Sequence, residues 1–262
     1  MDRWYPDKIM VGGIDAYNEM ARNRLFQDIA ATNSSKDQIC GVLNTATGGQ
    51  AASQRTTLSV GAPHLFGDEP EMMLRIMRGG HRRYLEFGVG GSTLMATRSG
   101  LQSVVAVDSD SHWVDAVLKH PEIDAAIRDG RVDIRHADIG PVTQWGYPRD
   151  LGHIQSWPTY IATAWDAWSE RNEMPDLIFV DGRFRVACCL SVVLVAASGS
   201  YPTDDLRVLL HDVGPDRPYY DDVFGFFDVV ESVNTLRVMK IKPGITGSCA
   251  MSMLLRHQFD LR

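Results

Sequence analysis

From residue 83 onward, short apolar runs alternate with segments of helical spacing, and this alternation restricts the fold more than any other feature of the sequence. The expected strands are 83–88, 103–107, 132–136, 177–180, 208–210, 228–232, 236–241 and 250–256. The expected helices are 69–79, 92–99, 111–119, 184–197 and one around 219–225. Because strands that alternate with helices form mostly parallel sheets covered on both faces, the sequence predicts an α/β fold.

An acidic residue lies at or just past the C-terminal end of each of the first five strands. These residues are Glu86, Asp108, Asp138, Asp181 and Asp212. In open α/β sheets ligands bind outside the carboxyl ends of the parallel strands, so the five acids are expected along one edge that binds a ligand.

A glycine-rich turn follows the first strand. Gly88, Gly90 and Gly91 tolerate backbone angles closed to other residues and let a ligand lie against the main chain. Ser92 or Thr93 can cap the next helix, whose free N–H groups face the same place. Since position 93 is threonine, the third glycine of the dinucleotide-binding fingerprint is absent, which weakens the interpretation as a dehydrogenase.

Composition excludes several classes of protein. The 262 residues carry a formal net charge of −7, whereas a nucleic-acid partner calls for a basic surface. The four cysteines form no C-x-x-C pair, so neither a zinc site nor a disulfide framework is expected. The longest apolar run, 186–197, is shorter than the roughly 20 residues that a membrane span needs. With no hydrophobic leader at the N-terminus, we expect a cytoplasmic protein with no membrane partner.

The glycine-rich turn resembles motif I of the class I S-adenosylmethionine-dependent methyltransferases, an acidic residue followed by G-x-G. The segment 175–188, with Asp181-Gly182-Arg183, resembles their motif IV. The resemblance covers about 70–260 and looks like a bacterial subfamily of class I methyltransferase-like proteins. A more distant likeness, through Asp181-Gly182, His211-Asp212-Val213 and Arg217, is to the glucuronoxylan O-methyltransferases. It implies a Rossmann-like, mostly parallel seven-stranded sheet, S-adenosylmethionine as cofactor and S-adenosylhomocysteine as product.

The cofactor-binding residues follow partly from chemistry and partly from this resemblance. Asp108, a carboxylate about 20 residues after the glycine-rich turn, can accept hydrogen bonds from both ribose hydroxyls. By resemblance, Glu86 orders the methionine end, and Asp138 and Ile139 contact the adenine. Trp113 either flanks the adenine or packs in the core. The expected set is Glu86, Gly88, Gly90, Gly91, Ser92, Thr93, Asp108, Ser109, Trp113, Asp138, Ile139 and Asp181.

Catalysis is assigned to Asp181 and His211, at the ends of neighbouring strands. Methyl transfer to a hydroxyl requires removal of its proton, and His211 is the better base on chemistry because imidazole titrates near neutral pH. The alternative for His211 is a hydrogen-bonded cap of its strand. Arg183, Arg185 and Tyr147 are expected to bind the acceptor, the two arginines holding an acidic group. Equally, the arginines can pair with Asp176 or Asp181.

Two further features leave alternatives open. Asp181 with Asp212 matches the metal position of some O-methyltransferases, but Val213-Gly214 replaces the second acid or asparagine, so no metal is expected. The insertion 140–175 carries six large aromatic residues. They can form an acceptor site or pack on the sheet, and packing is favoured.

The expected domains are an N-terminal helical extension with a lid, 1–68, and a methyltransferase domain, 69–262. Within the extension, 14–31 has helical spacing and 32–60 is polar, and a homodimer is expected to form through it. The predicted function is O-methylation of a small-molecule or saccharide acceptor. The alternatives are a binding or scaffold protein without catalysis, and aminopropyl transfer, which requires a cluster of acids for a polyamine.

Overall fold

A computed structural model gives the structure of the protein and describes residues 60–199 and 203–261. The chain divides into two units, Met1–Thr56 and Thr57–Arg262, and every described residue belongs to the second. The predicted helix at 14–31, the predicted lid and residues 32–59 lie outside the described residues. Residues 60–68, which precede the first labelled helix, belong to the second unit, and Val60 and Leu65 pack against its core.

Seven strands of the described residues form one sheet in the order β3-β2-β1-β4-β5-β7-β6. Their bounds are β1 Arg83–Phe87, β2 Ser103–Asp108, β3 Val132–His136, β4 Leu177–Val180, β5 Arg207–Leu210, β6 Phe227–Val233 and β7 Leu236–Ile241. β1 to β5 pair in parallel, while β7 is antiparallel to both β5 and β6. The predicted mostly parallel, seven-stranded sheet is confirmed.

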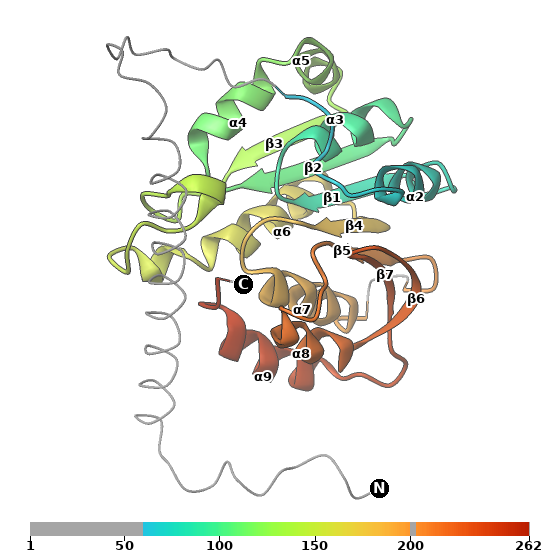
Figure 1. Cartoon of the computed structure of the whole chain (residues 1–262), viewed down its shortest axis with the longest axis vertical. Helices are drawn as coiled ribbons and strands as arrows, with labels where there is room; N and C mark the ends of the chain where they lie inside the picture. The colour runs from blue at the N-terminus through green and yellow to red at the C-terminus, as the bar shows by residue number, and fades with distance from the viewer. Residues whose placement is uncertain (1–59, 200–202, 262) are drawn as a thin grey trace, which may run out of the picture. The chain divides into compact units, whose positions relative to one another are not determined.

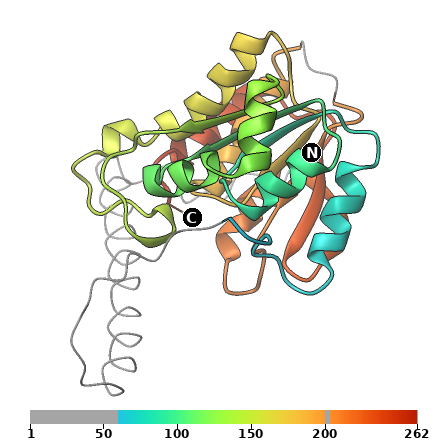
Figure 2. The same cartoon turned by 90° about the horizontal axis from the view of Figure 1, so that it is seen from above.

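Helices cover both faces of the sheet (Figures 1 and 2). The first group is α2 Glu69–Met77, α3 Gly91–Arg98, α4 Ser111–Leu118 and α5 Pro121–Arg128. The second group is α6 Thr159–Arg171, α7 Arg185–Ala196, α8 Asp221–Phe224 and α9 Gly247–His257. Contacts link α2, α3, α5 and α4 in the first group, and α6, α7, α8 and α9 in the second. None of the helices within 60–199 and 203–261 combines the length and hydrophobicity of a membrane span.

The central strands are buried on both sides, which explains their continuous apolar sequences. Tyr84, Leu85 and Phe87 of β1 are fully buried, as are all four residues of β4. On α2 the methionine-rich face, which includes Met73 and Met77, packs into this core. That face therefore supports the fold and leaves the sheet edge to the ligand-binding loops.

The predicted strand at 250–256 is wrong: these residues belong to helix α9. The run Ala-Met-Ser-Met-Leu-Leu-Arg contains no β-branched residue, and alanine, leucine, methionine and arginine are good helix formers. The Thr246 hydroxyl caps the helix by accepting a hydrogen bond from the Cys249 N–H. The periodicity of such a short apolar run fits a strand as well as a helix. Packing of the run against α7 decides in favour of the helix.

Candidate functional site

The strand order reverses between β1 and β4, and the loops that follow these two strands meet there. Gly88 has φ +123°, and a Cβ built on it lies 3.3 Å from the Gly182 backbone nitrogen. A Cβ on Gly182 would overlap the Tyr160 hydroxyl. Both glycines are therefore required because the two loops approach each other closely at the switch in strand order, where open α/β sheets bind their ligands.

Glu86 braces the glycine-rich turn from inside. Its carboxylate accepts hydrogen bonds from the Thr93 hydroxyl at 2.9 Å, the Tyr84 hydroxyl at 3.2 Å and the Ser92 hydroxyl. The Thr93 oxygen in turn accepts from the Gly90 N–H at 2.9 Å. Burial raises the pKa of Glu86 to about 8. Glu86, Ser92 and Thr93 thus face one another within the protein and fix the shape of the turn.

Asp108 lies at the end of β2, beside the same turn. Its Oδ2 accepts from the Val89 N–H at 3.2 Å, and its Oδ1 accepts from the Asp110 N–H at 2.9 Å. Burial raises the pKa of Asp108 to about 6. The Trp113 indole N–H donates to the Val89 carbonyl, and the ring lies 3.7 Å from a Cβ built on Gly90. The turn, Asp108 and Trp113 thus lie together, and Trp113 also packs against the hydrophobic core, which matches the second of its two predicted roles.

The end of β3 is more open. Asp138 is exposed and accepts a hydrogen bond from the Gly140 N–H at 3.0 Å, while Ile139 is buried. Ser109 is buried, and its hydroxyl donates to the Gly146 carbonyl at 3.2 Å. The insertion after β3 is therefore attached to the end of β2, and the adenine contacts of Asp138 and Ile139 stay predictions.

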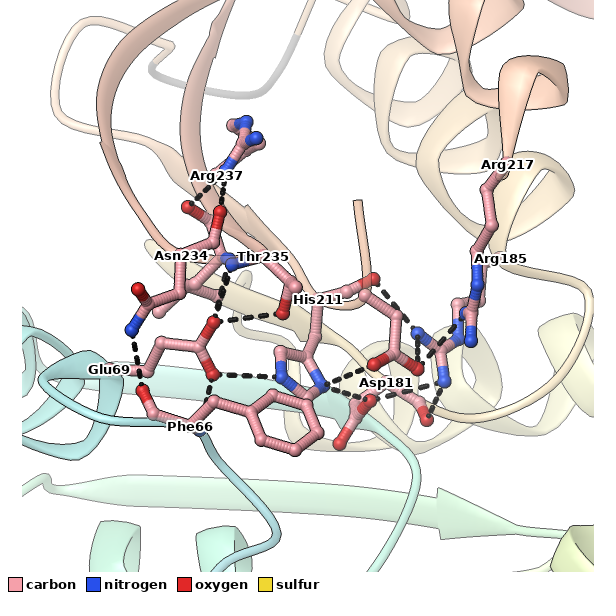
Figure 3. Close-up of polar contacts among 11 residues, drawn as sticks. Phe66, Glu69, Asp181, Arg185, His211, Arg217, Asn234, Thr235 and Arg237 are labelled. Atoms are coloured by element: carbon pink, nitrogen blue, oxygen red, sulfur yellow. Dashed lines mark hydrogen bonds and ion pairs between the residues drawn. The ribbon is translucent and has the colours of Figure 1, made fainter. Parts of the chain in front are cut away.

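His211 lies at the end of β5 with both ring nitrogens occupied by carboxylates. Nδ1 is 2.8 Å from Asp181 Oδ1, and Nε2 is 3.0 Å from Glu69 Oε2 (Figure 3). Although burial lowers it, the hydrogen bond and charge of Asp181, with Asp212 and Glu69, hold the pKa of His211 above its usual value. In this arrangement neither ring nitrogen of His211 has a free lone pair that could take the proton of the hydroxyl to be methylated. This counts against the predicted role of His211 as the base.

Arg185 is 4% exposed, and its five N–H groups match five protein acceptors. Nε donates to the Gly182 carbonyl at 3.0 Å, and Nη1 to the His211 carbonyl at 2.8 Å and Asp212 Oδ2 at 3.0 Å. Nη2 donates to the Asp181 carbonyl at 2.8 Å and forms an ion pair with Asp181 Oδ1 at 3.1 Å. The geometry thus matches the alternative in which this arginine pairs with Asp181, rather than the predicted acceptor-binding role.

Arg183 differs from Arg185 because its guanidinium has N–H donors without hydrogen-bond partners among the described residues. Its guanidinium carbon lies 4.0 Å from the centroid of the Tyr147 ring, and its buried Nε has no hydrogen-bond partner among the described residues. It also makes no ion pair within that part of the chain. The structure therefore brings Arg183 and Tyr147 together, as the acceptor-binding prediction requires.

The aromatic residues of the insertion divide between packing and the surface. Trp157, Tyr160 and Trp168 are fully buried, and the Trp165 indole donates to the Ser191 hydroxyl at 2.9 Å. Only Trp145 among the six is largely exposed, at 64%. The favoured interpretation, that most of these rings pack on the sheet, is confirmed.

Comparison with solved structures identifies the fold. A methyltransferase-like protein from Silicibacter pomeroyi is 27% identical, with a TM-score of 0.58, over 76% of this chain and 98% of that chain. By fold, the chain belongs to the class I S-adenosylmethionine-dependent methyltransferase superfamily.

Two other solved structures match with lower scores. A putative O-methyltransferase from Klebsiella pneumoniae is 17% identical over 70% of this chain and 84% of that chain, with a TM-score of 0.44. An O-methyltransferase from Bacillus cereus in complex with SAH is 16% identical over 89% of this chain and 94% of that chain, with a TM-score of 0.43. No protein-family model and no curated protein matches the chain.

The end of β2 offers a group suited to the cofactor of the class I methyltransferases. Asp108 is an acceptor-only carboxylate, and each of its oxygens keeps a lone pair beyond the backbone hydrogen bonds described above. In the turn itself Val89 and Gly90 are buried, the Trp113 ring lies against Gly90, and the backbone of Ala62 and Pro63 lies against Gly91. Asp108 can therefore accept the ribose hydroxyls of an adenosine, while Glu86 orders the turn indirectly.

A divalent metal fits less well. Asp181, His211 and Asp212 each offer one ligand atom within a 4.8 Å cluster. However, the Arg185 guanidinium bridges Asp181 and Asp212, and Arg217 Nη1 lies 3.0 Å from Asp212 Oδ2. Because these cations already neutralise both aspartates, the donor set does not match the oxygen cage that a hard cation needs.

Sequence reasoning missed Glu69. It stands at the first position of α2, where a glutamate before proline is typical of a helix start, and nothing nearby in sequence indicates a partner at His211. Only the pairing of β5 with β7 and the docking of α2 bring them together, so no local signal was available.

Proposed function

We propose that this protein is an S-adenosylmethionine-dependent methyltransferase that methylates an oxygen on a small-molecule or saccharide acceptor with an acidic group. One observation carries the proposal: the glycine-rich turn, Asp108 and the Asp181–His211 pair lie along the same edge of the sheet, around the switch in strand order. The turn and Asp108 are suited to the cofactor, and Asp181 to the acceptor.

Asp181 is the proposed proton acceptor. Its Oδ1 is held by His211 and Arg185, whereas its Oδ2 makes no hydrogen bond to the described residues and the side chain is 25% exposed. S-adenosylmethionine, held beside Asp108, would supply an electrophilic methyl group to the acceptor hydroxyl, and Asp181 would take the proton of that hydroxyl. His211 and Arg185 then act as its orienting partners.

The acidic group of the acceptor is assigned to Arg183. A guanidinium stacked on Tyr147, with a buried unpartnered Nε and no ion pair among the described residues, is suited to a carboxylate. The positive charge of the Arg183 guanidinium explains how an anionic substrate can bind a protein of net charge −7. It also counts against aminopropyl transfer, since a polyamine needs acids where this arginine stands.

A fold that binds the cofactor without catalysis is the second candidate. Isothermal titration with S-adenosylmethionine and S-adenosylhomocysteine tests binding first, and heat with micromolar affinity for either is expected. A screen of lysate and metabolite fractions with a labelled methyl donor then tests transfer. No heat with either ligand overturns the proposal, and binding without any labelled product favours the scaffold protein. The cytoplasmic location and the homodimer remain predictions of the sequence.

A further inference from the structure

Glu69 is a fully buried carboxylate with donors around both of its oxygens. Oε1 accepts from the Thr235 N–H at 2.7 Å, the Thr235 hydroxyl at 2.8 Å and the Leu236 N–H at 3.1 Å. Oε2 accepts from the Phe66 N–H at 2.7 Å and lies 3.0 Å from His211 Nε2 (Figure 3). One side chain therefore joins the segment before α2, the β6–β7 turn and the end of β5.

These contacts keep a negative charge against the ring of His211. Burial raises the pKa of Glu69, but the hydrogen bonds from Phe66 and Thr235 outweigh it and hold this pKa below its usual value. Phe66 also stacks on the His211 ring, with centroids 5.8 Å apart and planes 25° apart. The ring is thus held at its far nitrogen by Glu69 and on one face by Phe66.

We propose that Glu69 is a positioning residue of the active site, which fixes the His211 ring so that Nδ1 is directed at Asp181. The chain of contacts runs Glu69–His211–Asp181–Arg185–Asp212–Arg217, and negative and positive groups alternate along it. Without Glu69, rotation of the ring about its Cβ–Cγ bond would remove one of the two partners of Asp181 Oδ1 and leave only Arg185. The consequence for catalysis rests on the proposed function, whereas the orientation of His211 does not.

The decisive variant is Glu69→Gln, with two matched controls. The substituted amide keeps the side-chain volume and an oxygen for Thr235 and Leu236, but it replaces the charged oxygen that faces His211 Nε2 and the Phe66 N–H. Glu71→Gln makes the same chemical change on an exposed position of α2. Thr235→Val removes one donor to Glu69 and leaves the Glu69–His211 contact, so it reports the purely structural role of this cluster.

The readout is the ¹⁵N-edited NMR spectrum of the His211 side chain in the full chain, together with titration of S-adenosylhomocysteine. In the wild type we expect hydrogen-bonded protons on both His211 nitrogens. Glu69→Gln should change the Nε2 signal and keep the affinity for S-adenosylhomocysteine within about twofold, while both controls leave the His211 signals unchanged. With an acceptor from the labelled-donor screen, turnover of Glu69→Gln should fall roughly 10- to 100-fold.

The outcomes separate this proposal from the proposed function. A wild-type His211 with no proton on Nε2, or a folded Glu69→Gln variant with unchanged His211 signals, overturns the positioning role. If Glu69→Gln does not fold, the wild-type spectrum alone decides. If the wild type fails to bind S-adenosylhomocysteine, the proposed function is overturned, and the His211 signals still test the contact with Glu69.

Discussion

The proposed cofactor side and the proposed acceptor side of this site are built in different ways. On the cofactor side the partners are close in sequence: Glu86 contacts Ser92 and Thr93, six and seven residues away, and Asp108 contacts Val89, 19 residues away. On the acceptor side Glu69 and His211 are 142 residues apart. The first arrangement follows from one strand–turn–helix–strand unit, whereas the second requires the whole sheet to be assembled.

The two sides also treat their carboxylates differently. On the cofactor side burial raises the pKa of Glu86 to about 8 and that of Asp108 to about 6. On the acceptor side hydrogen bonds and cations overcome burial and lower the pKa of Glu69 and of Asp212. A carboxylate that contacts no cation can gain hydrogen bonds from the hydroxyl groups of a ligand. Carboxylates that are already paired with cations instead orient the side chains around them.

The largest effect is expected from Asp181→Asn. Because an amide cannot take the acceptor proton, turnover in the labelled-donor assay should fall roughly 10²- to 10⁴-fold, with little change in binding of S-adenosylhomocysteine. His211→Ala should reduce turnover less, since it removes only an orienting partner. Asp216→Asn, at a position 79% exposed in its side chain, serves as the control. A larger loss for His211→Ala than for Asp181→Asn would return the role of base to His211.

Asp108→Ala should abolish cofactor binding while the fold persists. Loss of two hydrogen bonds to a charged acceptor should weaken binding of S-adenosylhomocysteine by about 100-fold or more. Isothermal titration measures the affinity and circular dichroism measures the fold, and Asp115→Ala, on the exposed face of α4, is the control.

The affinity of the wild type for S-adenosylhomocysteine should also fall as pH drops below about 6, because burial raises the pKa of Asp108 to about 6 and the protonated acid is a poorer acceptor. Unchanged affinity in the variant would remove Asp108 from the cofactor site.

Arg183→Lys tests the acceptor side with a smaller expected effect. Lysine keeps the charge but loses the planar stacking on Tyr147 and the forked donors, so KM for an anionic acceptor should rise about tenfold. Affinity for S-adenosylhomocysteine should change little, and Arg149→Lys, exposed on the same insertion, should match the wild type. If Arg183→Lys weakens the cofactor instead of the acceptor, Arg183 belongs to the cofactor side.

Glu86→Gln should change the pH dependence of stability more than stability itself. The folded pKa of about 8 exceeds the unfolded value of 4.5, so the native state holds a proton that the unfolded state has lost between these values. The stabilising contribution of Glu86 is complete below pH 4.5 and is lost as pH rises to about 8. Relative to the wild type, the melting temperature of Glu86→Gln should therefore rise by roughly 10 °C between pH 5 and pH 9. Parallel curves for the two proteins would show that Glu86 is not buried in this way.

The cofactor side was largely predictable because its signals are local. The strands at 83–88, 103–107 and 132–136 were placed within a residue of the observed ends, and the turn between the first strand and α3 carries its own glycines. Helix α5 was not predicted, and 250–256 was assigned to a strand. The latter error has a plain cause, since a short apolar run fits either period until a neighbour such as α7 buries one face.

The sequence by itself determined the sheet, its order of elements and the edge at which acids gather, because strand periodicity and turn glycines act over a few residues. The tertiary structure decided which charges pair. It turned Arg185 inward onto Asp181 and Asp212, left Arg183 on Tyr147, and placed Glu69 against His211. The physical reason is that a charged side chain can reach several partners of opposite sign, and only the packing of distant strands and helices determines which of them lies within hydrogen-bond distance.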